Sequence, residues 1–202
     1  MKHPCRMELV PPETKGYTTA LLAWIVAIHY AAGTEVEAKE AIETLHKTIE
    51  KSENWVIQNL RDLIRYDRMR VVGSNLHYIS SKEGALKMQE TIRRPLSAKE
   101  MEEFSHIADL ALEDTDCILM IVRTKRDQQV VDLVKQITDR VYVFGSSFFP
   151  IDLREDLSIL HAIIPFQMAA AIVAQRIGND TSRYPYDIEN ISHSEQYAFR
   201  TK

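Results

Sequence analysis

The stretch MRVVGSNLHYISSKEGALKMQETIR, residues 69–93, decides the fold. Its first residues, Met69-Arg70-Val71-Val72, predict a strand, because β-branched valines favour extended backbone. The small polar residues Gly73-Ser74-Asn75 then predict a turn, and a helix follows from Ser80 to about Arg93. A strand, a turn and a helix in succession form the repeating unit of α/β proteins.

The same alternation continues towards the C-terminus. We predict strands at Leu96–Ala98, Cys117–Arg123 and Arg140–Phe144, and helices at Lys99–Ile107, Asp127–Thr138 and Leu153–Ile177. Pro165 predicts a kink in the last helix, and Gly178 ends it. Apolar strands that alternate with helices predict a parallel sheet covered on both faces.

The segment before residue 69 predicts a short strand at Arg6–Val10 and a helix from Thr14 to Ala32. An amphipathic segment from Glu35 to about Arg65 follows, as one helix or as two that meet near Ser52 and Asn54. The apolar run ALLAWIVAIHYAA, residues 20–32, is shorter than the roughly 20 residues that span a membrane. We therefore expect this first helix to be buried between other elements, with Trp24 and Trp55 in the core.

Composition narrows the functional classes. The chain has 202 residues, 27% of them charged, and a net charge of −4, which argues against a nucleic-acid partner. Its two cysteines, Cys5 and Cys117, cannot form a ligand cluster and fit a reduced, cytoplasmic protein. Neither a zinc-ligand spacing nor a P-loop occurs in the sequence. We expect a cytoplasmic protein.

Four stretches, in order, resemble the sugar isomerase (SIS) family of phosphosugar-binding domains. They are Pro12–Thr18 (PETKGYT), Gly73–Glu90 with its KEGALK segment, Glu103-Phe-Ser-His106, and Asp156–Gly178 with Ile164-Pro165 and Gln167. The order resembles the C-terminal part of double-SIS proteins: the isomerase half of glucosamine-6-phosphate synthase, and fructosamine-6-phosphate deglycases.

The resemblance implies a three-layer αβα fold with a central parallel sheet, preceded by helices. Residues 1–66 would be the trailing strand and helix of a first SIS domain plus a helical linker. Residues 67–178 would form an SIS domain, and residues 179–202 a C-terminal arm.

The chain also departs from that family. The Ser/Thr-rich loop with which the first SIS domain holds the sugar phosphate is absent from the sequence. Residues 187–193 contain no lysine, although the synthases use one near the C-terminus to bind the sugar carbonyl carbon. Ile107-Ala108 stands where the synthases have Gly-Pro after the family histidine.

The resemblance implies three catalytic residues, and each has an alternative. Glu90 would be the base that moves a proton through an enediol, or an exposed glutamate paired with Lys87 or Arg94. Lys87 would orient the Glu90 carboxylate or neutralise the negative charge that develops on the sugar oxygens. Alternatively, it would form only an i,i+3 ion pair with Glu90. His106 would help to open the sugar ring in a neighbouring subunit's site, or be a surface or capping residue.

Candidate substrate-binding residues come from two places. Glu13, Thr14 and Lys15 would form one wall of the sugar site, as that motif does in relatives. Ser74, Asn75, Ser80 and Ser81 lie where amides and hydroxyls could hold an anion before a helix N-terminus, although Ser80 could equally be a simple N-cap.

The expected function is phosphosugar binding in a sugar-phosphate isomerase or fructosamine-6-phosphate deglycase type of protein. Enediol chemistry on a sugar needs only acid–base groups, so we expect no metal and no organic cofactor. The alternative is a non-catalytic phosphosugar-sensing module, or a remnant that needs a partner chain. The partners implied are a hexose or amino-sugar phosphate and a second chain. That chain would be a homodimer partner or one that supplies the missing first SIS half. We expect neither a nucleic acid nor a membrane as a partner.

Overall fold

The computed structural model describes residues 12–150 and 153–182, without the side chains of residues 107–109. The strand expected at Arg6–Val10 and nearly all of the expected C-terminal arm lie outside these residues. Everything below concerns the described part of the chain.

A four-stranded parallel sheet forms the middle layer, as predicted. Its strands are β1 (Met69–Gly73), β2 (Leu96–Glu100), β3 (Cys117–Ile121) and β4 (Val141–Phe144), in the order β2-β1-β3-β4. The register sets Met69 beside both Leu96 and Cys117. All five residues of β3 are buried, as expected of a central strand covered on both faces.

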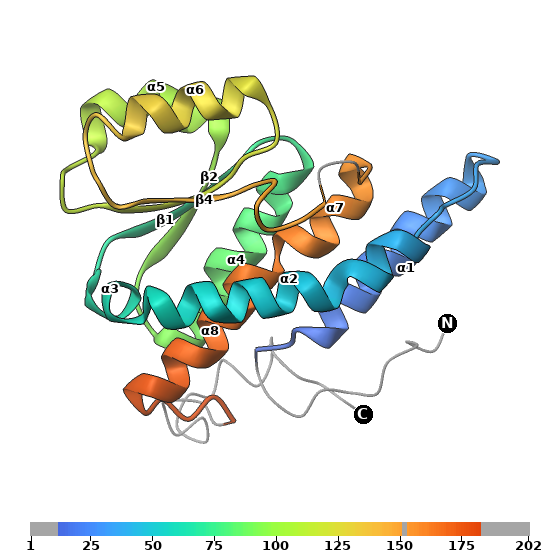
Figure 1. Ribbon diagram of the computed structural model, residues 1–202, viewed down its shortest axis with the longest axis horizontal. Helices are drawn as coiled ribbons and strands as arrows, with labels where there is room; N and C mark the ends of the chain where they lie inside the picture. The colour runs from blue at the N-terminus through green and yellow to red at the C-terminus, as the bar shows by residue number, and fades with distance from the viewer. Residues whose placement is uncertain (1–11, 151–152, 183–202) are drawn as a thin grey trace, which may run out of the picture.

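Helices cover both faces of the sheet, so the three-layer α/β prediction is confirmed (Figure 1). Alternate strand residues face opposite sides. Val72 packs with α5 (Met101–Ala111) and α6 (Lys125–Val134) on one side. Val71 packs with α4 (Leu76–Ile92) and α8 (Ile164–Ile177) on the other.

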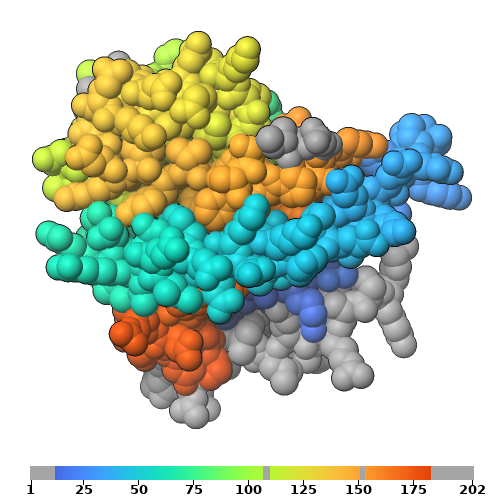
Figure 2. Space-filling model, viewed as in Figure 1, coloured from blue at the N-terminus to red at the C-terminus, as the bar shows by residue number. Residues whose placement is uncertain are grey.

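A long helix, α2 (Lys39–Gln58), lies against α8 and runs across the molecule in Figure 2. The short α3 (Leu60–Arg65) follows it. The break between them falls at Asn59, and not near Ser52 and Asn54 as predicted. Ser52 is tolerated inside α2 because its hydroxyl donates to the Thr48 carbonyl one turn earlier, at 2.6 Å.

The first helix, α1 (Lys15–Ala31), contradicts the expectation of burial. Ile25 is its one buried residue, while Trp24 is 68% exposed and its apolar neighbours are exposed as well: Val26, Ile28 and Tyr30. A nearly all-apolar sequence therefore does not reveal whether its partner lies within the same chain. We call the exposed side chains of Trp24, Val26, Ile28 and Tyr30 the α1 apolar face.

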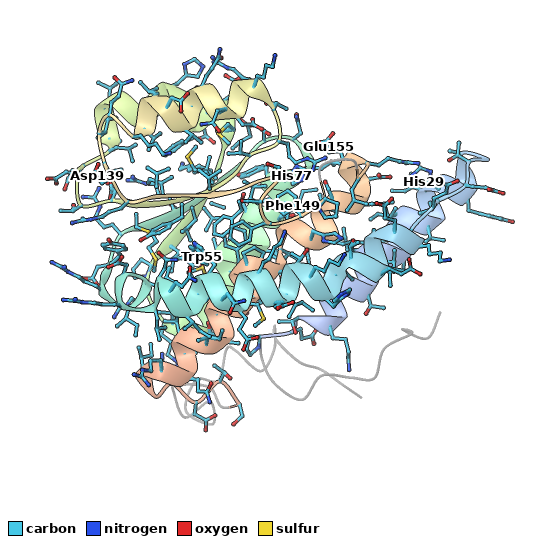
Figure 3. All side chains as sticks on the ribbon, in the orientation of Figure 1. His29, Trp55, His77, Asp139, Phe149 and Glu155 are labelled. Atoms are coloured by element: carbon cyan, nitrogen blue, oxygen red, sulfur yellow. The ribbon has the colours of Figure 1, made fainter. Side chains whose placement is uncertain are left out.

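Trp55, in contrast, lies where the sequence predicts. It points from α2 into the layer beneath the sheet (Figure 3), with its ring edge-on to Phe144 at a centroid distance of 4.7 Å. Tyr142 and Phe148 complete this aromatic cluster, so Trp55 joins α2 to the end of β4.

The last predicted helix is two helices, α7 (Glu155–Ala162) and α8, divided at Ile163 just before Pro165. Gly178 ends α8 in the left-handed conformation, with φ of 77°. Together they form the one segment within the described ranges that is long and apolar enough to cross a membrane, Glu155–Ile177. Because 78% of its most apolar window is buried inside the protein, its composition is that of a core element.

Candidate functional site

Helix α4 carries most of the predicted site residues, and two unusual features place it. Asn75, the residue before its first turn, has a positive φ of 51°, which lets the chain turn directly from β1 into the helix. Gly84 lies so close to Phe166 of α8 that an added Cβ would come within 2.7 Å of the ring. The missing side chain of Gly84 therefore lets α4 pack tightly on α8.

Lys87 is the centre of an ionic cluster on α4. Its ammonium lies 2.8 Å from a Glu90 carboxylate oxygen and 3.5 Å from one of Glu83. The exposed fractions of these side chains are 6% for Lys87, 13% for Glu83 and 32% for Glu90. The predicted Lys87–Glu90 pair is thus present, and Glu83 is a third member that the sequence analysis missed. We call these three residues the α4 cluster.

Burial sets the protonation behaviour of this cluster. Desolvation raises the pKa of the Glu83 carboxyl, Lys87 partly offsets the increase, and the charge of Glu90 adds to it. Tyr17, from α1, lies close enough for Glu83 to contribute to its shift: burial raises the Tyr17 pKa to about 12. The Tyr17 hydroxyl is buried and has no hydrogen-bond partner in the described part of the chain. A half-buried carboxyl beside an unpaired phenol is suited to exchanging a proton with a bound ligand.

One signal in the sequence could have identified Glu83, because it precedes Lys87 by four residues and so shares its helical face. Tyr17 could not be identified in this way, since it is 66 residues from Glu83 in the sequence and approaches it only through the packing of α1.

Ser80 and Ser81 are not at a helix N-terminus, because α4 begins at Leu76, four residues earlier than predicted. Both are fully buried inside the helix. The Ser81 hydroxyl donates to the His77 carbonyl at 3.1 Å, and that of Ser80 contacts the Ile159 carbonyl at 3.5 Å. The interpretation of Ser80 as the N-cap is therefore wrong.

Ser74 and Asn75 do lie at the carboxyl end of β1, next to the start of α4. Lys87 is about 11 residues further along α4, or about 16 Å along the helix axis. The structure therefore does not bring these two polar residues to the α4 cluster. Glu13 and Lys15 are exposed where α1 begins, and Thr14 is half-buried in the N-cap position.

His106 lies on the other side of the sheet. It is an exposed residue of α5, and it is near enough to Glu102 to help lower the pKa of that carboxyl, whose hydrogen bond to Arg126 is the main cause. The α4 cluster belongs to the opposite helical layer. Within one chain, Glu90 and His106 therefore cannot act on the same molecule.

His77, in the first turn of α4, is buried, with 1% of its surface exposed (Figure 3). The Ser158 hydroxyl donates to the Glu155 carbonyl, so the His77 Nε2–H donates to Ser158, at 3.0 Å. The other nitrogen, Nδ1, is left as a buried acceptor without a partner in the described ranges. Burial, helped by the charge of Arg123, lowers the His77 pKa to about 4.

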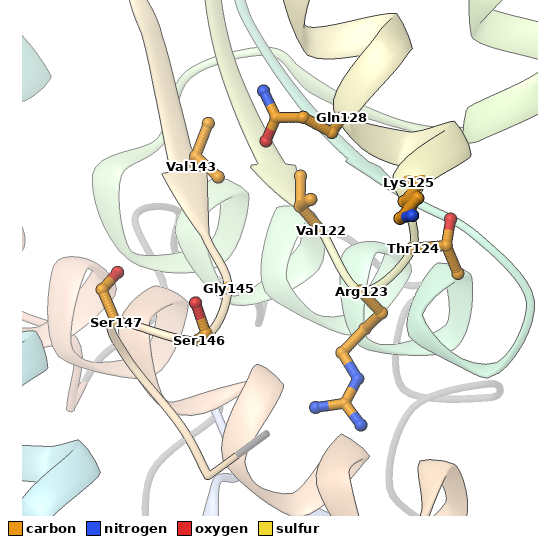
Figure 4. A pocket seen from close by; sticks show the side chains of 9 residues that line it. All are labelled: Val122, Arg123, Thr124, Lys125, Gln128, Val143, Gly145, Ser146 and Ser147. Atoms are coloured by element: carbon orange, nitrogen blue, oxygen red, sulfur yellow. The ribbon is translucent and has the colours of Figure 1, made fainter. Parts of the chain in front are cut away.

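A pocket of about 380 Å³ opens at the carboxyl ends of β3 and β4 (Figure 4). One wall is the end of β3 with the start of α6, and the other is the loop that follows β4. Its lining residues are Val122, Arg123, Thr124, Lys125, Gln128, Val143, Gly145, Ser146 and Ser147. We call it the β3–β4 pocket. The sequence analysis did not identify it, because its walls come from two separate turns.

No group of three or more His, Cys, Asp or Glu side chains is arranged to hold a metal ion within residues 12–150 and 153–182. The candidates for a functional site in the described part of the chain are therefore the acid–base groups of the α4 cluster and the polar residues of the β3–β4 pocket.

Comparison with protein-family models and with curated protein sequences gives no match. Solved structures do match. A proposed sugar-binding protein of Salmonella typhimurium LT2 is 26% identical, with a TM-score of 0.72 over 84% of this chain. A proposed phosphosugar isomerase of Clostridium difficile 630 is 22% identical, with a TM-score of 0.78 over 94% of the chain. Glucosamine-6-phosphate deaminase of Thermotoga maritima is 19% identical, with a TM-score of 0.74 over 91%.

The chain spans only 58% to 60% of the length of these three proteins. Their likeness to it covers the parallel sheet and the helices on both of its faces. The described residues therefore form a domain of the sugar isomerase (SIS) fold, as the resemblance in the sequence predicts.

Proposed function

We propose that this chain binds a phosphorylated sugar and that the α4 cluster moves a proton on it, as sugar-phosphate isomerases and fructosamine-6-phosphate deglycases do. The observation that supports this most is the nearly buried Lys87 ammonium between the Glu83 and Glu90 carboxylates. Two of the matching proteins are described as a phosphosugar isomerase and a glucosamine-6-phosphate deaminase, which act on this class of compound.

The chemistry follows from the exposure of each group. Glu90 is the most exposed of the three, so its carboxylate can reach a ligand, take a proton from one sugar carbon and return it to the neighbouring carbon. Lys87 would stabilise the negative charge that develops on the enediol oxygens. Glu83, with its raised pKa, would hold Lys87 in place and buffer the charge of the cluster.

A second chain completes this proposal. His106 lies across the sheet from Glu90, so a site that uses both must take His106 from another subunit. The α1 apolar face provides a surface that such a subunit could cover. We propose a homodimer, or a partner chain that carries a first SIS half, in which Glu13, Thr14 and Lys15 contribute to the sugar site. We propose that this assembly is cytoplasmic.

Proton transfer can be measured without knowing the final product. Fructose 6-phosphate, glucosamine 6-phosphate and fructoselysine 6-phosphate would first be screened by thermal shift. Exchange of the sugar C1 and C2 hydrogens with D2O would then be followed by NMR. We expect Glu90→Gln to slow the exchange by about 10²- to 10⁴-fold. The control Glu53→Gln, on the exposed side of α2, should not change it.

The same experiment has two contrary outcomes. Full exchange with Glu90→Gln would show that Glu90 is not the base. Binding of a sugar phosphate without any exchange in the unmodified protein would favour the non-catalytic sensing module. If two chains share the site, mixing Glu90→Gln and His106→Ala proteins should restore part of the lost exchange.

A further inference from the structure

Helix α7 is joined to each of three neighbouring helices through a histidine. It contacts α1, α2 and α4, and the histidines at these contacts are His29, His161 and His77, respectively. Figure 3 shows His77 and His29 on opposite sides of α7. We propose that these contacts make α7 an acid-sensitive latch: acidification releases α7 from α4 and α2, while α7 stays attached to α1. The latch is separate from the proposed proton transfer at the α4 cluster.

The contact with α4 requires His77 to be neutral. Its Nε2–H donates to the Ser158 hydroxyl oxygen at 3.0 Å, in a buried position. A second proton would be placed on Nδ1, which is buried and has no acceptor in the described part of the chain. The guanidinium of Arg123 acts against that charge, and the carboxylate of Asp127 offsets the effect only in part. A protonated His77 therefore needs water, which reaches the ring when the contact between α4 and α7 opens.

The contact with α2 has the same requirement. His161 is fully buried, its Nε2–H donates to the Ala41 carbonyl at 2.9 Å, and its Nδ1 accepts from the Thr48 hydroxyl at 2.7 Å. The neutral ring thus has both nitrogens satisfied. A charged ring would lose its hydration in this position, and burial accordingly lowers the pKa of His161. Acid weakens this second contact as well.

The contact with α1 responds in the opposite way. In His29, Nε2 lies 2.8 Å from an Asp156 carboxylate oxygen and Nδ1 lies 2.7 Å from the Thr34 hydroxyl oxygen. A protonated ring donates to both and forms an ion pair with Asp156. Arg154 also contacts this Nε2, at 2.6 Å, but it is exposed and can turn towards water.

Asp156 itself keeps its charge in mild acid. Desolvation acts to raise its pKa, but hydrogen bonds from His29 and Arg154 lower the pKa of this carboxyl overall. Its attachment to α1 is therefore present above its ordinary pKa of 3.8 and is lost only at lower pH. The His77 contact is complete above pH 6.5 and is lost as the pH falls towards the folded-state pKa of about 4. Between these limits α7 is held by α1 alone.

Packing confines the movement to one end of the molecule. Helices α1 and α7 and the start of α2 share a small hydrophobic cluster that is separate from the one beneath the sheet: Ile25, Ala41, Leu153, Leu157, Ile159 and Leu160. Both α1 and α7 lie at the end of the molecule away from α3 (Figure 1). The break at Ile163, before Pro165, provides a hinge, so α7 can move without unwinding α8.

The test is native-state amide hydrogen exchange of the full chain, read by NMR as protection factors at pH 7 and pH 4.5. We expect the protection of α7 to fall by about 10- to 100-fold at pH 4.5, because the released His77 binds a proton that the enclosed ring excludes. Protection of β1 and β3 should stay within about threefold, since local opening leaves the sheet intact. In the same samples, the His77 ring signals should titrate together with the loss of protection in α7.

Three variants assign the response to individual contacts. His77→Gln keeps a side-chain N–H donor but cannot titrate, so it should remove most of the pH-dependent loss in α7. The matched control is His46→Gln, which changes an exposed histidine of α2 and should leave the loss as in the wild type. In His29→Gln, α1 should also lose protection at pH 4.5, because no ion pair with Asp156 can form.

Four results would overturn the proposal. The first is an equal loss of protection in α7 and in the sheet, which would indicate global unfolding. The second is a loss in His77→Gln as large as in the wild type. The third is titration of the His77 ring near pH 6.5 while α7 remains protected. The fourth is unchanged protection of α1 in His29→Gln. None of these results depends on whether the α4 cluster transfers a proton.

Discussion

The α4 cluster and the β3–β4 pocket use charge in opposite ways. In the α4 cluster, two carboxylates surround one ammonium in a mostly buried position, so the positive charge of Lys87 is compensated within the protein itself. In the pocket, no carboxylate is among the lining residues, and Lys125 is exposed, while Arg123 donates to the Leu153 carbonyl at 2.9 Å. A buried cluster of interacting acidic and basic groups is suited to moving a proton, whereas the pocket is open and its lysine is left to the solvent.

The largest effect should come from removing the ammonium of the α4 cluster. Lys87→Met leaves Glu83 partly buried beside Glu90, and we expect it to lower the free energy of unfolding by about 3 kcal/mol at pH 7. The loss should be smaller at pH 5 than at pH 7, because the raised pKa of the Glu83 carboxyl makes its protonation easier. Urea unfolding at both pH values measures it. The control Lys82→Met removes an exposed lysine on the same helix and should cost under about 1 kcal/mol.

The second largest effect should be the pH dependence of stability that comes from His77, in the first turn of α4. Its folded-state pKa of about 4 is below the ordinary value of 6.5, so the unfolded chain binds a proton more readily. Its contribution to stability is present above pH 6.5 and is lost as pH falls towards 4, by roughly 3 kcal/mol in total.

Unfolding of the wild type and of His77→Gln at a series of pH values tests this. The variant should lose most of the change in unfolding free energy with pH in this window. A smaller part of that change should remain, because burial also lowers the pKa of His161. Parallel slopes in the two proteins would mean that His77 is not the group that titrates.

The third prediction uses Gly84→Ala, a change in packing that should affect the α4 cluster and leave the β3–β4 pocket as it is. The added methyl would meet Phe166, and we expect a loss of about 2 kcal/mol in stability from overpacking. Since Gly84 lies beside Glu83, proton exchange on a sugar phosphate should fall as well. NMR amide shifts of residues 122–128 and 145–147, around the β3–β4 pocket, should be unchanged, and changes there would show that the two regions are coupled.

The smallest effect is expected on the pocket side. Thr124 caps α6 in a reciprocal pair with Asp127, and Thr124→Ala should cost about 1 kcal/mol of stability. The exposed Thr115 provides a matched control, and Thr115→Ala should change stability by less than about 0.5 kcal/mol. Equal effects in thermal unfolding would contradict the capping role.

The sequence predicts the layers of this fold well, because strand runs such as Cys117–Ile121 are apolar throughout and the helices between them are periodic. It predicts helix ends less well. The start of α4 depends on the positive φ of Asn75, which let the helix begin four residues before Ser80. The site was predicted where it is local in sequence, as in Lys87 and Glu90, and missed where it depends on packing, as in Tyr17 and the two walls of the pocket.

Because the two tryptophans lie in different surroundings, the intrinsic fluorescence of the chain can report on assembly and on unfolding separately. Trp24 is in contact with water on the α1 apolar face, whereas Trp55 is enclosed by aromatic rings beside β4. Indole emission shifts to shorter wavelength when water is removed, so a subunit that docks on α1 would shift the Trp24 signal without unfolding anything. Emission from Trp55 would change only when the core itself opens, and single Trp→Phe variants would separate assembly from unfolding.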